Sequence, residues 1–76
     1  MNVVGPRVRK ARVAAGMTQA ILAARLEVRG LRIDRSGVAK IEGGFRRVSD
    51  RELVAIADAL SVSAGWLLGE HDVLKE

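Results

Sequence analysis

The chain has 76 residues, 49% of them hydrophobic and 29% charged, with a formal net charge of +4; these values favour one small folded domain over residues 1–76 rather than a disordered chain. The absence of cysteine excludes a disulfide framework and a thiolate metal site. Because no apolar run approaches the roughly 20 residues of a membrane span, and the first residues lack the apolar core of a signal peptide, we expect a cytoplasmic protein without a membrane partner.

The first predicted helix covers residues 5–15. Pro6 suits its first turn, and Gly16 suits the left-handed position just past its end. Arg12 falls on the apolar stripe of this helix, where a charge needs a partner or a route to water. The other members of the stripe are Val4, Val8, Ala11 and Ala15.

The second predicted helix covers residues 18–28. Thr18 is a good N-cap residue, and Gly30 is suited to end the helix. Leu22 and Leu26 recur at helical spacing and are expected to face the core.

The third predicted helix covers residues 34–43 and begins at Asp34 as its N-cap. Glu42 lies about 40° from the apolar Val38 on a helical wheel and is therefore turned inward. Two opposite charges on the apolar stripes of neighbouring helices predict a buried ion pair between Arg12 and Glu42. The alternative is two separate surface charges.

The fourth and fifth predicted helices cover residues 49–60 and 63–69. Ser49 and Glu52 have the spacing of a capping box, and Ser63 opens the last helix. The five elements together predict an all-α fold. The apolar residues expected to close its core from this end are Leu53, Ile56, Ala57, Leu60, Trp66 and Leu67.

Positive charge is concentrated in the first two thirds of the chain. Residues 1–51 hold 12 of the 13 Lys and Arg against four acids, whereas residues 52–76 hold one against five acids. Ten of the basic residues are arginines, whose planar fork suits phosphates and guanine edges. This asymmetry indicates a polyanionic partner, although a lopsided solvated surface would give the same counts.

The helix over residues 34–43 has the features of a DNA recognition helix, because it follows a second capped helix as in a helix–turn–helix. The helical wheel places its polar face opposite Val38 and Ile41. The alternative is that this face is only solvated. The residues expected to contact base edges in the major groove are Arg35 and Lys40 (guanine), Ala39 (a thymine methyl) and Ser36 (base or phosphate).

From Arg7 to about Gly69, the chain resembles the phage-repressor and Cro family of helix–turn–helix proteins. The stretches that carry the resemblance are RVRKARVAAGMTQAILAARL, VAKIEGG and LVAIADALSVSAGWLLGE. The resemblance implies a lambda-repressor-like five-helix fold. It also implies an ion pair at the positions of Arg12 and Glu42, in agreement with the helical wheels.

The resemblance further implies contacts with DNA phosphates. Gln19 would contact a phosphate and brace the recognition helix, and we assign Thr18, at the same helix start, to the phosphate contacts as well. The loop after the third helix would run along the DNA backbone, with Arg46 and Arg47 on phosphates.

The chain departs from the family pattern in three places. Gly37 and Gly43 stand where polar side chains are common, and Gly37 is expected to weaken its helix by about 1 kcal/mol. The connection between the second and third helices is about five residues longer than the usual short turn. We expect Arg29 and Arg32 in this connection to point outward and contact phosphates. The alternative is an inert spacer.

No set of residues in the sequence forms a catalytic, cofactor-binding or metal-binding constellation, so we expect neither an enzyme nor a cofactor. We expect a sequence-specific regulator of transcription that binds double-stranded DNA and acts as a repressor. Such proteins usually bind as dimers, and the expected dimer face includes Leu68, Val73 and Leu74. The alternatives are an antitoxin-like module that binds a protein partner on the same scaffold, and an interaction domain without a DNA role.

Overall fold

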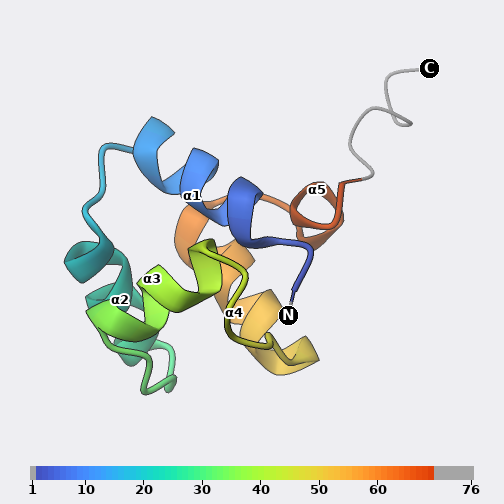
Figure 1. Ribbon diagram of the computed structural model, residues 1–76. Helices are drawn as coiled ribbons and strands as arrows, with labels where there is room; N and C mark the ends of the chain where they lie inside the picture. Colours follow the sequence, from blue (N-terminus) through green and yellow to red (C-terminus); the bar gives the residue numbers. More distant parts are fainter. Residues whose placement is uncertain (1, 70–76) are drawn as a thin grey trace.

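The computed structural model describes residues 2–69, and this part of the chain folds into five helices without a strand (Figure 1). The all-α five-helix fold is therefore confirmed, with helix ends within one or two residues of those predicted. Val73 and Leu74 of the expected dimer face lie outside the described residues. The helices are α1 (Gly5–Ala14), α2 (Gln19–Val28), α3 (Arg35–Glu42), α4 (Asp50–Leu60) and α5 (Ala64–Leu67).

Side-chain caps from Thr18, Asp34, Ser49 and Ser63 define where four of these helices, α2 to α5, begin. The hydroxyl of Thr18 accepts a hydrogen bond from the backbone N–H of Ile21 at 3.0 Å, and the Asp34 carboxylate accepts one from Gly37 at 2.8 Å. Ser49 and Glu52 form the predicted capping box at the start of α4. Because each cap satisfies backbone donors that the first helical turn leaves unpaired, the helix starts can be recognised from sequence.

The core lies where all five helices meet, and most of the apolar residues predicted to face it are buried. Ala15 is a correction: it is exposed, because it lies just past the end of α1 at Ala14, beyond Arg12, the last residue of this helix that the core buries. No helix between residues 2 and 69 is both long and apolar enough to span a membrane. The largest fully buried side chains are Val8, Leu22, Leu26, Val38, Ile41, Ile56 and Leu67.

The first turn of α1 packs directly on the last turn of α3. A Cβ atom at Gly5 would overlap the carbonyl oxygen of Ile41 and would lie 2.8 Å from that of Glu42. The absence of a side chain at Gly5 therefore lets the two backbones approach, which fixes the end of α3 against α1.

Residues 29–34, here called the lengthened turn, connect α2 to α3 and pack against the core. Ile33 is buried in this turn and Leu31 is half-buried. A Cβ atom at Gly37 would lie 2.8 Å from Cγ2 of Ile33. Gly37 lowers the helix propensity of α3, but it leaves room for the Ile33 side chain, which packs the lengthened turn against the core.

Candidate nucleic-acid interface

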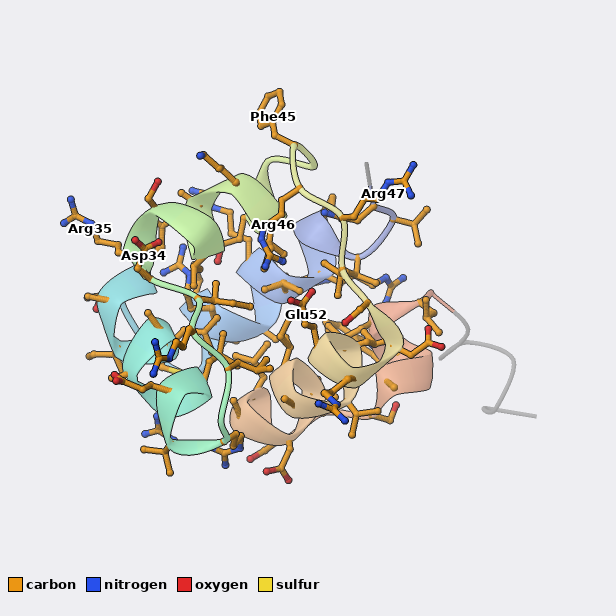
Figure 2. The ribbon with its side chains drawn as sticks, turned by 90° about the horizontal axis from the view of Figure 1, so that it is seen from below. Asp34, Arg35, Phe45, Arg46, Arg47 and Glu52 are labelled. Carbon is orange, nitrogen blue, oxygen red and sulfur yellow. The ribbon has the colours of Figure 1, made fainter. Side chains whose placement is uncertain are left out.

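The outward face of α3 carries the four side chains predicted to contact bases. Val38 and Ile41 are 1% exposed and anchor the helix to the core. At the N-terminal end of α3, Arg35 extends away from the body of the molecule (Figure 2). The exposed residues on α3 include Arg35, Ser36, Ala39 and Lys40.

A shallow groove of about 610 Å³ lies between the start of α2 and the start of α3. Thr18 Oγ1 accepts its capping bond there, which leaves the hydroxyl hydrogen as a donor. The groove combines this donor with the cation of Arg35 and the free N–H groups of a helix start, all of which suit a phosphate. Besides Ala20, the groove is lined by five residues that were predicted to contact DNA: Thr18, Gln19, Arg35, Ser36 and Ala39.

The ion pair between Arg12 and Glu42 is present in the structure. Arg12 Nε lies 2.6 Å from Glu42 Oε2, Arg12 Nη2 donates to Oε1 at 3.1 Å, and the two side chains are 11% and 4% exposed. The hydrogen bonding of its guanidinium to the Glu42 carboxylate is the main cause that raises the pKa of Arg12, while burial opposes it. Gln19 Nε2 donates to Glu42 Oε1 at 3.1 Å, and Arg12 Nη1 donates to the carbonyl of Met17. One carboxylate thus joins α1, the start of α2 and the end of α3.

Residues 43–49, here called the α3–α4 loop, hold the two arginines that were predicted to contact phosphates. Arg47 is exposed, whereas Arg46 turns toward α4 (Figure 2). Arg46 donates to both oxygens of Glu52 at 3.0 and 3.1 Å. These hydrogen bonds are the main cause that lowers the pKa of Glu52, with smaller contributions from the Ser49 backbone and hydroxyl, and burial opposes them. Arg46 therefore fastens the loop to α4.

Asn2 holds the same loop from the other side, a role that no pattern in the sequence predicts. Its Nδ2 donates to the carbonyls of Ile41 at 3.0 Å and Arg46 at 2.7 Å, and its Oδ1 accepts from the N–H of Gly5 at 2.7 Å. The side-chain amide thereby joins the start of α1 to the end of α3 and to the α3–α4 loop.

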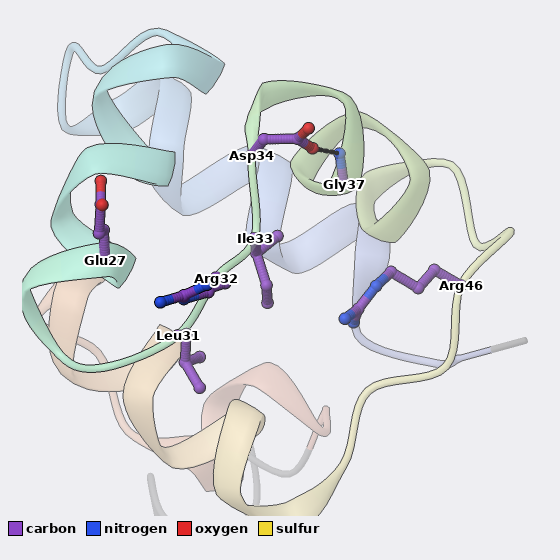
Figure 3. A pocket seen from close by; sticks show the side chains of 7 residues that line it. All are labelled: Glu27, Leu31, Arg32, Ile33, Asp34, Gly37 and Arg46. Carbon is purple, nitrogen blue, oxygen red and sulfur yellow. Dashed lines mark hydrogen bonds between the residues drawn. The ribbon is translucent and has the colours of Figure 1, made fainter.

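The two arginines of the lengthened turn have different surroundings. Arg29 donates to Asp58 on α4 at 2.7 Å and to the Arg25 carbonyl at 2.9 Å. Arg32 is exposed and lines a cleft of about 540 Å³ between the lengthened turn and the α3–α4 loop (Figure 3). Arg46 points toward this cleft from its far side. Contact with phosphates stays a prediction for both arginines of the turn, and Arg29 already has a protein partner.

Within residues 2–69, no cluster of three or more His, Cys, Asp or Glu could hold a metal ion. A family model described as helix-turn-helix matches residues 8–67, which is most of the chain. No curated protein and no solved structure matches the chain.

Proposed function

The chain belongs to the helix-turn-helix family, of the type found in phage repressors and Cro, and we propose that it is a sequence-specific, cytoplasmic regulator of transcription that acts as a repressor. Proteins of this type bind DNA, and α3 has the geometry to enter the major groove. The observation that carries the proposal is that Arg35, Ser36, Ala39 and Lys40 are all exposed on a helix whose opposite face is buried.

The groove at the start of α2 would let the protein bind the DNA backbone at a fixed position. Thr18 and Gln19 would contact one phosphate there, beside the base-reading face of α3. Arg47 would contact a second phosphate at the far end of α3, where it is exposed. We keep Arg46, Arg29 and Arg32 as further phosphate contacts, with the first two expected to contribute less because acidic side chains hold them.

We propose that the protein acts as a homodimer on two half-sites about one DNA turn apart. A single α3 reads one half-site, so a second copy doubles the length of sequence that is read. Val3 and Leu68 are exposed at a cleft of about 460 Å³ on the side of Val48 and Leu53. These apolar side chains support a protein contact on this surface.

The test is selection of bound sequences from a pool of random duplexes. An enriched two-fold symmetric sequence would support specific binding by a dimer. Arg35→Ala should relax the preference at one position of each half-site, at a cost of about 1–3 kcal/mol in binding. No enrichment, together with no duplex shift at low salt, would refute the proposal.

The second candidate is an antitoxin-like or other protein-interaction module. The observation that favours it is again the exposed apolar pair Val3 and Leu68. A variant with both Arg35→Ala and Lys40→Ala discriminates the two candidates. DNA regulation requires these two side chains, whereas a protein partner bound elsewhere would be retained by the variant.

A further inference from the structure

An aromatic side chain is exposed at the C-terminal end of the recognition helix. Phe45 is 81% exposed, lies three residues beyond α3 and points away from the body of the molecule (Figure 2). Arg35 and Phe45 thus lie at opposite ends of α3. A lone exposed apolar side chain is ordinary on a protein surface. The position of Phe45 beside the recognition helix, and the contacts that hold its backbone, are the reasons to give it a role.

The backbone that carries Phe45 is fixed on several sides. The N–H of Phe45 donates to the Lys40 carbonyl at 2.9 Å, and Asn2 donates to the carbonyl of the next residue, Arg46, at 2.7 Å. The ion pair between Arg46 and Glu52 fastens that residue to α4. The ring is therefore presented by an ordered loop, which reduces the entropy lost when it makes a contact.

The ring of Phe45 lies close to the backbone of Gly43, on the side where a side chain would stand. A Cβ atom at Gly43 would be 2.8 Å from both Cδ2 and Cε2 of Phe45. Gly43 stands where a polar side chain would be expected to contact phosphate. In this chain Gly43 has no side chain, and the edge of the Phe45 ring lies in the space that such a side chain would take.

The charges around the ring indicate which part of DNA it would meet. Lys40 is exposed on α3 before Phe45, and Arg47 is exposed after it. These two cations suit phosphates, and between successive phosphates of a strand lies a deoxyribose, whose carbon atoms form the apolar part of the backbone. If the two cations bind successive phosphates, the apolar ring between them would face the deoxyribose that joins those phosphates.

We propose that Phe45 packs against a deoxyribose of the DNA strand at the C-terminal end of α3 and supplies affinity that does not depend on salt. The proposal rests on DNA binding as proposed above. It assigns a separate physical role to one side chain, because removing water from a ring releases no counterions from phosphates.

The experiment measures the dissociation constant as a function of salt for a mixed-sequence duplex of roughly 21 base pairs, about two DNA turns. Phe45→Ala should raise the dissociation constant about ten-fold, since part of the burial energy of a Phe is lost, with the slope of log K against log salt unchanged. Phe45→Leu should show a smaller loss. Val54→Ala, which shortens an exposed side chain on α4, is the matched control and should bind as the wild type does.

Phe45→Lys should change the salt dependence of binding, which Phe45→Ala should not, because an ammonium at this position would lie among phosphates. Its slope should steepen by about 0.9, whereas Arg47→Ala should flatten the slope by about the same amount. The high exposure of Phe45 predicts unchanged thermal unfolding for its variants.

Wild-type affinity in Phe45→Ala, or an unchanged slope in Phe45→Lys, would overturn the proposal. A change of oligomer mass in Phe45→Ala with wild-type DNA affinity would assign the ring to a protein contact instead. If the wild type itself fails to bind the duplex at low salt, the proposed function fails. If the wild type binds and Phe45→Ala binds equally well, this inference alone fails.

Discussion

Gln19 and Glu42 are joined by a hydrogen bond of 3.1 Å that runs from the first residue of α2 to the last residue of α3. The same Glu42 oxygen also accepts from Arg12. A side chain expected to contact a phosphate is thus oriented by the ion pair that holds the recognition helix. Gln19 can use one amide hydrogen for Glu42 and still offer the other to DNA.

Glu42→Ala should lower the free energy of unfolding by about 3–5 kcal/mol, because it leaves the Arg12 guanidinium in a nearly buried position without its carboxylate. Urea denaturation measures the effect. Replacing both partners with apolar residues, as in Arg12→Met with Glu42→Leu, should cost less than Glu42→Ala alone. A single variant as stable as the wild type would show that the pair contributes nothing.

Asn2→Ala should lower the free energy of unfolding by about 1–3 kcal/mol, since three hydrogen bonds of a half-buried amide are lost. The α3–α4 loop should also become less ordered, which hydrogen exchange at the Phe45 amide would detect. Val13→Ala, at an exposed position of α1, is the control. Equal exchange rates in Asn2→Ala and the wild type would contradict this role.

Gly37→Ala should destabilise the protein although alanine is the better helix former. The new Cβ would lie 2.8 Å from Ile33 Cγ2, and overpacking costs about 1–3 kcal/mol against a gain in propensity of about 1 kcal/mol. Thermal unfolding in an Ile33→Leu background, which lacks the methyl group Cγ2 on Cβ, should show a smaller penalty. The explanation is wrong if the penalty is the same in both backgrounds.

The free energy of unfolding should depend on the ionisation of Glu52 at acidic pH. Its hydrogen bonds with Arg46 lower its pKa below the ordinary value of 4.5, so the folded state binds this proton less readily than the unfolded chain. The stabilisation is complete above about pH 4.5 and is lost as the pH falls through the lowered pKa. Glu52→Gln keeps a capping-box side chain without a titrating group. Its unfolding free energy should therefore fall less steeply below that pH, and identical pH profiles would exclude the effect.

Arg32→Ala should flatten the slope of log K against log salt by about 0.9, as expected for one lost phosphate contact. Arg29→Ala should flatten it less, because Asp58 and the Arg25 carbonyl already engage its guanidinium. Asp58→Ala frees Arg29 and should steepen the slope. If none of the three variants changes the slope, the lengthened turn is a spacer.

Local signals explain which parts of the fold could be predicted from the sequence. The caps Thr18, Asp34 and Ser49 act on residues three positions away, so their spacing is visible in the chain. Arg12 and Glu42 could be paired because both interrupt apolar stripes.

Contacts between residues far apart in the chain and outside helical stripes could not be predicted. Asn2 lies before the first helix and binds backbone carbonyls 39 and 44 residues away, where no periodicity marks a partner. The partners Asp58 and Glu52 of the predicted phosphate-binding arginines were missed for a similar reason. Acids near arginines are common, and only the packing of α4 decides which of them meet.

The residues that hold α3 in place are separate from those on its outward face. Val38, Ile41 and Glu42 point inward, and no hydrogen bond or ion pair from the side chains of Arg35, Ser36 or Lys40 anchors the helix within residues 2–69. Randomising the outward positions should therefore yield libraries in which most members still fold. The scaffold is thus suited to engineering variants with new operator preferences by exchanging a handful of codons.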